Sequence, residues 1–259
     1  MLLKIAWANL KRHGRRSALI VFGVAVSVAV MLFLVALVAG MEADFYRAML
    51  NDAGHVRIRA EGIDDALDPY SLDYLISNPE SVITDVRSVE GVEAAEQVMT
   101  FGALVIGSEK NAPMIGYGIT PQTDYFSGVR SGIQEGRFQI ETGEALISSS
   151  NAAMLNLGLE DPLVLMVEDS TGAPYYLEYD VAGIFQSNSS EFDDMAVFIR
   201  HTDAADLLYV GDSTREIRLT LADPERSADV AERVRAALGN QNLTVETWQE
   251  INGSYIVFM

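Results

Sequence analysis

The chain contains no cysteine, which excludes disulfide bonds and thiol catalysis. It also lacks the Gly-x-x-x-x-Gly-Lys-Ser/Thr phosphate loop of many ATPases and the Gly-x-Ser-x-Gly nucleophile elbow of many hydrolases. We therefore predict no catalytic residues in this chain. Without disulfides, a domain outside the cytoplasm must be held together by its own hydrophobic core, and the chain is long enough to form one.

Histidine is also scarce, since only His13, His55 and His201 occur and no two of them have His-x-x-x-His spacing. A zinc site is therefore not expected. The acidic run at 191–194 follows a Ser/Asn-rich stretch and could hold calcium, but its spacing is not that of an EF-hand loop. A solvated acidic loop is the ordinary interpretation of such a run. We expect neither a metal nor a cofactor in this chain.

Acidic residues are absent from the first 41 positions, and charged residues of either sign are absent from Ala18 to Ala39. Ser27 is the only polar residue in this run of 22. At about 1.5 Å per residue, a helix of this length spans roughly 33 Å, enough for a hydrocarbon core of about 30 Å. The sequence predicts a transmembrane helix over residues 18–41.

The charges that flank this run are asymmetric, and they predict its orientation. Five basic and no acidic residues precede it: Lys4, Lys11, Arg12, Arg15 and Arg16. The positive-inside rule places the N-terminus in the cytoplasm and the residues after about Met41 outside it. Within the leader of residues 1–17, the segment around Trp7 is typical of a short amphipathic helix at the interface, with Trp7 as the anchor at headgroup depth.

A cleaved signal peptide is the main alternative to a retained anchor. Residues 38–40 (Val-Ala-Gly) are small enough for a weak cleavage site. The apolar core of a signal peptide usually has about 7–15 residues, however, and is shorter than this run. We therefore favour a retained anchor.

The balance of charge outside the leader is strongly acidic. The chain has a net charge of −19, and the residues after position 40 hold 13 basic and 37 acidic side chains, a net charge of −24. Such a domain repels nucleic acid and anionic headgroups, so nucleic-acid binding is excluded as a function. Solubility explains the acidic excess, although a basic partner protein remains open.

The predicted span carries two sets of candidate contact residues. Gly23 and Ser27 lie four residues apart, and such a small-xxx-small face lets another helix approach closely. The second set could line a path for an acyl chain, contact lipid or pack against a helix: Met31, Phe33, Leu34, Leu37 and Met41. The four-residue spacing continues from Met41 to Phe45 and Met49, which predicts a helical stalk to about Asn51, ended by Gly54.

The outer region shows a strand–helix–strand pattern near each end. Pro follows a capping residue at Asn78-Pro79 and again at Asp223-Pro224, and Gly91 and Gly239 close the two helices. The strands expected around them are 55–59, 98–106, 114–119, 217–221 and 243–247. Residues 132–211 have a different pattern, in which several short apolar segments are separated by turn residues. This pattern predicts a mostly β insertion with a small core of its own. Its expected strands are 163–167, 175–185 and 196–199, and its expected helices are 149–157 and 202–209.

Residues 253–259 follow a polar turn and end in five apolar residues. This pattern is typical of the opening of a second transmembrane helix. A frayed hydrophobic tail and a final strand are the alternatives.

Six short segments, in order along the chain, carry a family resemblance: residues 5–12, 54–58, 116–121, 145–159, 181–194 and 247–252. Together they resemble the N-terminal part of the permease subunits of type VII ABC transporters, the superfamily of the MacB, LolC/LolE and FtsX types. The segment Gly-His-Val-Arg-Ile at 54–58 is most similar to the lipoprotein-releasing LolC/LolE branch.

The resemblance implies an α+β extracytoplasmic domain on an N-terminal transmembrane helix. In this superfamily the outer domain has a Porter part, built here from strand–helix–strand units, and an inserted, mostly β Sabre part. The implied boundaries are a leader at 1–17, the first span at 18–41, Porter-like parts at 42–131 and 212–252, a Sabre-like part at 132–211 and the start of a second span at 253–259.

The implied function is mechanotransmission at the bacterial inner membrane. A separate ABC ATPase subunit hydrolyses ATP, and the membrane helices carry the motion to the outer domain, which releases or exports a lipoprotein or other amphiphile. ATP would bind the partner subunit rather than this chain. The further partners implied are a second permease copy or paralogue, membrane lipid, and a periplasmic carrier or adaptor protein.

One departure leaves other functions open. LolC-type permeases capture a periplasmic carrier with a long loop, whereas the matching hairpin here has only the short turn at 169–174. The alternatives are an FtsX-like signal transmitter that activates a cell-wall hydrolase and a single-span anchored periplasmic binding module.

Overall fold

The computed structural model describes residues 14–63, 69–107, 110–121, 123, 125–239 and 241–251, without the side chains of residues 39 and 41–53. The chain divides into two compact units, Met1–Ala48 and Met49–Met259. The predicted interfacial helix around Trp7 lies outside the described residues, and so does the predicted start of a second span at 253–259.

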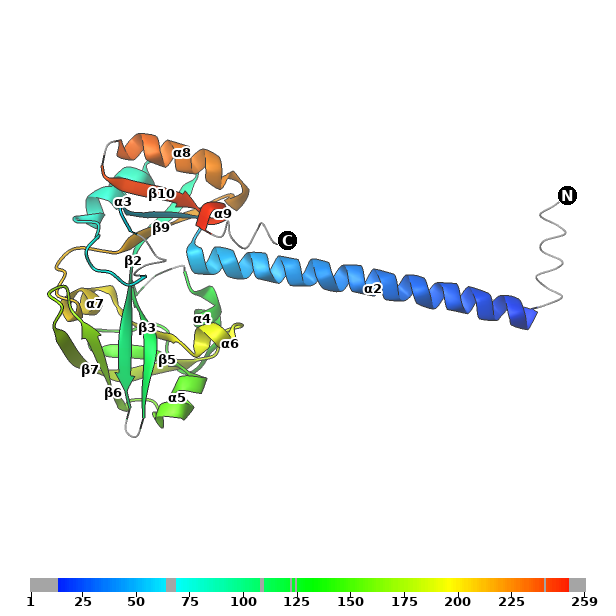
Figure 1. Cartoon of the computed structure of the whole chain (residues 1–259), viewed down its shortest axis with the longest axis horizontal. Helices are drawn as coiled ribbons and strands as arrows, with labels where there is room; N and C mark the ends of the chain where they lie inside the picture. Colours follow the sequence, from blue (N-terminus) through cyan, green and yellow to red (C-terminus); the bar gives the residue numbers. More distant parts are fainter. Residues whose placement is uncertain are drawn as a thin grey trace. The chain divides into compact units, whose positions relative to one another are not determined.

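Helix α2 (Gly14–Ala53) is a single helix of 40 residues (Figure 1). Its segment Gly14–Val38 is long and apolar enough to cross a membrane, and none of it is buried against the rest of the chain. The predicted helical continuation beyond the span is confirmed, because the helix runs on to Ala53. Gly54 then adopts a φ of +72°, which glycine tolerates best and which ends the helix.

The second unit combines ten strands and several short helices among the described residues (Figure 1). The strands are β1 (Val56–Ala60), β2 (Val92–Ile106), β3 (Asn111–Ile119), β4 (Ile133–Gly136), β5 (Glu144–Ser148), β6 (Pro162–Glu168), β7 (Pro174–Phe185), β8 (Ala196–Arg200), β9 (Glu216–Leu221) and β10 (Leu243–Thr247). The helices are α3 (Pro79–Arg87), α4 (Ser127–Ser131), α5 (Ser149–Leu155), α6 (Ser190–Asp193), α7 (His201–Leu207), a 3-10 turn (Pro224–Arg226), α8 (Ser227–Leu238) and α9 (Trp248–Ile251).

Four antiparallel strands form a layer in the order β10-β1-β9-β2. Helices α3 and α8 supply the apolar side chains that pack on one face of this layer, such as Val86 and Val234. The strands contribute alternate residues to the same cluster, among them Ile58, Ile217 and Val245. This alternation leaves the residues between them on the opposite face.

Six strands close into a ring in the order β2-β3-β8-β5-β7-β6, since β6 pairs with both β7 and β2. The long strand β2 belongs to both parts: residues 92–98 pair with β9 in the layer, and residues 99–106 pair with β3 in the ring. A closed ring of this size is filled by its own side chains. Buried residues from all six strands accordingly form one cluster, which includes Phe101, Val197 and Leu165.

Two glycines of β3 make room for this packing. A Cβ at Gly116 would lie 2.3 Å from the ring of Phe101, and a Cβ at Gly118 would lie 2.6 Å from Cβ of Ala204 in α7. Helix α7 therefore sits directly against the strands near the end of β3. Helix α5 packs near the opposite end of the β2–β3 hairpin, where Gly107 contacts Leu155.

The outer face of β3, β5 and β8 is covered by an aromatic cluster. Tyr117 stacks on Phe198 with ring centroids 5.2 Å apart, and Phe126 meets Phe198 edge-to-face at 4.9 Å. Phe185 completes the group, with its centroid 5.6 Å from that of Phe198. Each such pair contributes about 0.5–1.5 kcal/mol beyond the area it buries. The cluster fixes α4 and α6 against the ring.

Strand β10 is an edge strand, and side chains protect its outer backbone groups. Arg235 donates to the carbonyl of Val245 at 2.5 Å, and Glu250 accepts from the amide of Thr247 at 2.7 Å. Arg235 and Glu250 also pair with each other, with a separation of 3.4 Å. A satisfied edge is a poor template for a strand from another chain.

Most of the predicted elements are confirmed, including the strands at 163–167, 175–185 and 196–199. Both Pro-initiated helices are present, but α3 ends at Arg87, before the predicted Gly91, and Pro224 begins the 3-10 turn that precedes α8. Asn78 was expected to cap α3 through its side chain, but it makes no such hydrogen bond. Its φ of +54° is left-handed, a conformation that asparagine tolerates better than most residues, so it serves the turn instead.

Two further expectations differ from the structure. The acidic run 191–194 is not wholly solvated, because Asp193 is buried in α6 and accepts from the amide of Ser187 at 2.9 Å. The small core expected within 132–211 is shared with the β2–β3 hairpin, because Phe101 and Met114 of that hairpin belong to the same cluster as Val197. Pairing of β3 with β8 and of β2 with β6 joins these segments.

Candidate functional site

The predicted contact residues of the span lie on the exposed surface of α2. Met31 and Phe33 are about two-thirds exposed, and Leu34 and Leu37 are about half exposed. Nothing described lies within 4 Å of a Cβ placed at Gly23, so this face is open to a partner helix or to lipid. Met41 and Phe45 lie on the same helix, but their side chains are outside the described residues.

Ser27 donates from its hydroxyl to the carbonyl of Gly23 at 2.9 Å. This local hydrogen bond satisfies the only polar side chain of the apolar run, which lowers the cost of placing serine in hydrocarbon. The face formed by Gly23 and Ser27 is therefore small and internally satisfied. These are the properties that close packing against another helix requires.

The chain passes from α2 into β1 through only two residues, Gly54 and His55. A Cβ at Gly54 would lie 3.2 Å from the ring of Tyr125 and 3.3 Å from Cβ of Arg218, so the junction is tightly packed. His55 donates its backbone amide to Leu219 and accepts from the amide of Leu221 through Nδ1 at 2.8 Å. Burial lowers the pKa of His55 below its usual value, which keeps Nδ1 available as an acceptor.

The end of β10 lies beside this junction. Val56 pairs with Thr247 across the two strands, and the amide of Trp248 donates to the carbonyl of His55 at 3.2 Å. The strand that follows α2 and the strand that leads to residues beyond 251 are therefore direct neighbours. Main-chain hydrogen bonds join the two strands at this point.

Charged side chains line the face of the four-stranded layer that α3 and α8 do not cover. In the strand register, Glu246 of β10 lies opposite Arg57 of β1, Arg57 lies opposite Arg218 of β9, and Arg218 lies opposite Glu96 of β2. A second row places Arg59 opposite Glu216. We refer to these six residues as the charge ladder.

Close ion pairs connect the charge ladder across the strands. Oε2 of Glu246 accepts from Arg57 at 3.2 Å and from Arg59 at 2.8 Å. Oε1 of Glu216 lies 2.6 Å from Arg218, and its Oε2 lies 3.7 Å from Arg57. The two shortest, Arg59 to Glu246 and Arg218 to Glu216, have the length of charge-assisted hydrogen bonds, which are roughly twice as strong as neutral ones.

Three of the six residues of the charge ladder are buried. Arg59, Glu216 and Arg218 are each less than 10% exposed. Burial by itself raises the pKa of Glu216, but attraction to Arg218 and then to Arg57 outweighs burial and holds the pKa below its usual value. Glu216 is thus an ionised carboxylate in the interior, held by arginine on its own strand and on the next.

Arg218 also contacts the aromatic cluster. Its guanidinium carbon lies 5.5 Å from the centroid of Phe126, within the range of a cation–π interaction. Through this contact the charge ladder of the layer meets the packing that surrounds the ring. Burial raises the pKa of neighbouring Tyr125 well above its usual value, so this phenol stays neutral at the junction.

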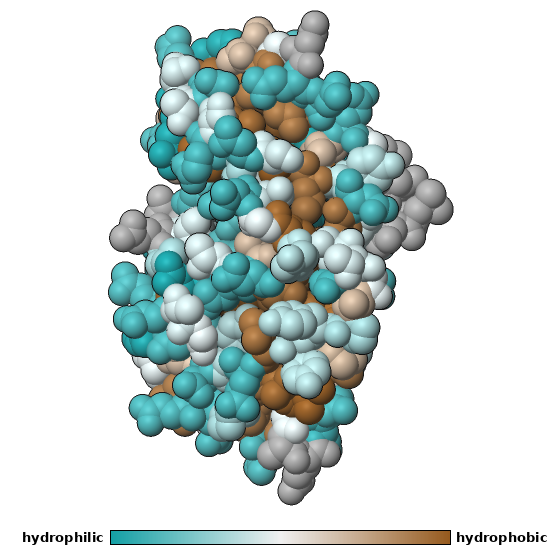
Figure 2. All heavy atoms as spheres, turned by 90° about the vertical axis from the view of Figure 1, so that its left-hand side faces the viewer, coloured by the Kyte–Doolittle hydropathy of each residue, from teal (hydrophilic) through white to brown (hydrophobic). Residues whose placement is uncertain are grey.

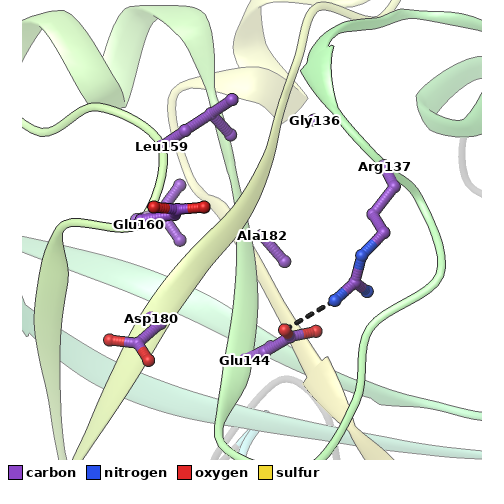
Figure 3. Close-up of a pocket in the computed structure, with 8 residues that line it drawn as sticks. Gly136, Arg137, Glu144, Leu159, Glu160, Asp180 and Ala182 are labelled. Carbon is purple, nitrogen blue, oxygen red and sulfur yellow. Dashed lines mark hydrogen bonds and ion pairs between the residues drawn. The ribbon is translucent and has the colours of Figure 1, made fainter.

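A surface depression of about 570 Å³ lies elsewhere, beside β5 and β7 (Figure 3). Arg137 pairs with Glu144 at 2.6 Å on one side of it, and Glu160 and Asp180 lie on the other side. Its walls are largely polar, whereas the face of the second unit shown in Figure 2 has hydrophobic residues along its length between hydrophilic ones. Within the part of the chain that the structure describes, no three metal-binding side chains gather at one place.

Sequence reasoning did not identify the charge ladder. The signal was present, because alternation in 55–59 places Arg57 and Arg59 on one face, and alternation in 216–221 does the same for Glu216 and Arg218. Strand patterns say which residues share a face. They do not say that a charged face will be buried.

Comparison with known proteins gives a consistent assignment. The model of the MacB-like periplasmic core domain family matches residues 17–237. The periplasmic region of MacB from Actinobacillus actinomycetemcomitans has the same fold, with a TM-score of 0.54 and 12% identity over 80% of this chain and 95% of that one. The extracellular domain of YknZ, a noncanonic ABC-type transporter from Gram-positive bacteria, matches with a TM-score of 0.48 and 12% identity over 74% of this chain and 99% of that one.

No curated protein sequence matches this chain. The family model nevertheless covers most of its length, including nearly all of α2, three of the four strands of the layer and the whole ring. The chain belongs to the MacB-like periplasmic core domain family of ABC transporter permeases.

Proposed function

We propose that this chain is the membrane-anchored outer part of an ABC transporter permease that works by mechanotransmission. ATP is hydrolysed by a separate subunit in the cytoplasm, α2 crosses the inner membrane, and the outer domain moves a lipoprotein or another amphiphile on the far side. The observation that carries this proposal is the direct connection from α2 to β1, beside the end of β10, in a member of the MacB-like family.

The arrangement of the four-stranded layer and the six-stranded ring supports this function. The four-stranded layer is built from the early and late segments of the chain, and the ring is built mostly from the middle. We assign the layer to the Porter part and the ring to the Sabre part. Force that enters through α2 then reaches the layer first and the ring afterwards, through the shared strand β2.

The exposed surface of α2 supports the proposed partners in the membrane. The face with Gly23 and Ser27 suits a helix from a second permease copy or a paralogue. The larger side chains Met31, Phe33 and Leu37 suit lipid or the acyl chain of an amphiphilic cargo. A periplasmic carrier or adaptor would receive the cargo outside the membrane.

Reconstitution tests the proposal. The full-length permease is purified in lipid nanodiscs with each candidate ABC ATPase subunit, and ATP hydrolysis is measured with and without the permease. We expect a stable complex and ATPase activity that depends on the permease, whereas an ATPase with an inactivated catalytic site gives no signal. Failure of every candidate ATPase to bind would contradict the proposal, and binding of a cell-wall hydrolase instead would identify an FtsX-like transmitter.

A further inference from the structure

The apolar face of β1 fixes the strand's position along its neighbours only in part. Val56 and Ile58 point into the same core at a spacing of two residues. A shift of β1 by two residues would place Ala60 in the buried position of Ile58, so packing opposes it, although the side chains on this face would still be apolar. A second feature adds to packing in defining the register of the strand that follows α2.

The opposite face of β1 supplies that feature. In the native register Arg57 and Arg59 both reach Glu246, and Arg59 lies opposite Glu216. If a pull along α2 toward the membrane shifted β1 by two residues, Arg59 would take the place of Arg57. Glu61 would then lie opposite the buried carboxylate of Glu216.

This shifted register is electrostatically unfavourable. It would place two carboxylates opposite each other at a site where solvent cannot screen them, since Glu216 is only 4% exposed. It would also place Arg59 opposite Arg218 and take Arg57 away from Glu246. The charges therefore add to the penalty that packing places on this movement.

We propose that the charge ladder is a register lock, which holds β1 in place under load so that force on α2 moves the layer as one body. Glu246 is its central positioning residue, because it bridges Arg57 and Arg59 on β1 from the neighbouring strand β10. This inference deepens the proposed function and rests on it for the source of the force. The lock itself is a property of the folded chain and can be tested separately.

Disulfide trapping measures the register directly, because the natural chain has no cysteine. Ala60→Cys with Leu243→Cys reports the native register, in which these residues are paired. Ala60→Cys with Val245→Cys reports the register shifted by two residues, since cysteines that are diagonal in the native sheet are too far apart to bridge. Each pair is introduced into the full-length permease in nanodiscs, with the charge ladder intact or altered.

The first experiment uses the permease alone. With the charge ladder intact, only the native pair forms a disulfide. Glu246→Gln increases trapping of the shifted pair by at least about fivefold. The control Glu90→Gln, which removes the exposed partner of Arg233, leaves trapping unchanged. The double variant Arg59→Met/Glu246→Leu controls for misfolding caused by an unpaired buried charge, because apolar residues of similar volume replace both charged side chains. It is expected to fold and also to trap the shifted pair.

The second experiment adds the ATPase subunit and ATP. Turnover increases trapping of the shifted pair in Glu246→Gln further, and it lowers the amount of cargo released per ATP while the rate of ATP hydrolysis stays the same. A protein that is merely destabilised would lose both activities together.

The outcomes separate the two ideas. If Glu246→Gln and the double variant both keep the native register in the first experiment, the register lock is wrong, whatever the ATPase does. If both trap the shifted register there but turnover adds nothing, the lock stands and the proposed transfer of force is contradicted.

Discussion

Nε2 of His201 lies 3.1 Å from the hydroxyl of Thr214, where α7 packs on the ring. The Thr214 hydroxyl also lies 3.1 Å from the carbonyl of Val98, and when it donates its proton there it accepts from Nε2–H of a neutral imidazole. Burial lowers the pKa of His201 to about 4. The folded domain therefore disfavours the imidazolium form, whereas the unfolded chain takes up a proton near pH 6.5.

This difference predicts loss of stability in mild acid. A group whose pKa is lower in the folded state contributes its full stability above the unfolded value, and the contribution is lost as the pH falls from about 6.5 toward 4. The free energy of unfolding should decrease by up to about 1.4 kcal/mol per pH unit in this window through His201. Chemical denaturation at several pH values checks this.

The control for this prediction is His201→Gln, which keeps a hydrogen-bond donor but does not titrate. Its stability should depend less on pH between 6.5 and 4 than that of the natural protein, with the remaining dependence due to His55 and the carboxylates. An unchanged pH dependence in this variant would show that another group is responsible.

Substitution of Gly118 tests the packing of α7 on the ring. Gly118→Ala places a methyl group 2.6 Å from Cβ of Ala204 and 3.1 Å from Cβ of Met99. Overpacking of this kind costs about 1–3 kcal/mol of unfolding free energy. Gly128→Ala is the matched control, because nothing lies within 4 Å of its added methyl group. Thermal unfolding of both variants should show a lower midpoint for Gly118→Ala alone.

Removal of Arg235 tests the protection of the β10 edge. Arg235→Ala leaves the carbonyl of Val245 without the guanidinium that covers it and separates Glu250 from its partner. We expect concentration-dependent self-association, measured by light scattering of the detergent-solubilised protein. Arg233→Ala removes an arginine from the same helix without touching the edge. Equal behaviour of the two variants would argue against a protected edge.

A charge in the middle of the apolar segment tests its membrane role. Val28→Asp should cost roughly 2.5–3.5 kcal/mol for insertion at the centre of a span. We predict loss of the protein from the membrane fraction, measured by fractionation after alkaline washing, whereas Val28→Leu remains inserted. Equal recovery of the two variants in membranes would mean that α2 is not a span.

Local signals in the sequence predicted the elements of the layer well. Pro79 and Pro224 begin helical turns, Gly54 and Gly239 follow helix ends, and alternation identified β1, β9 and β10. These signals act over a few residues, so one sequence is enough to recognise them. The strands β4 and β5 were missed because each has only four or five residues and little alternation.

Long-range features could not be predicted in the same way. Closure of the ring depends on pairing of β6 with β2, in which Leu104 meets Met166, and no local pattern encodes this contact. The burial of Glu216 depends likewise on the neighbouring strands and on Arg218 lying beside it. The family resemblance predicted a MacB-like outer domain correctly, but it said nothing of the charge ladder.

The central claim is that the folded domain lies outside the cytoplasm and is joined by α2 to a cytoplasmic N-terminus. Labelling of single cysteines with a membrane-impermeant thiol reagent in intact spheroplasts tests it most directly, because the natural chain offers no thiol. Glu80→Cys, at an exposed position in α3, should react without permeabilisation, and Arg16→Cys should react only after the membrane is opened. Equal reactivity of the two positions in intact spheroplasts would contradict the account.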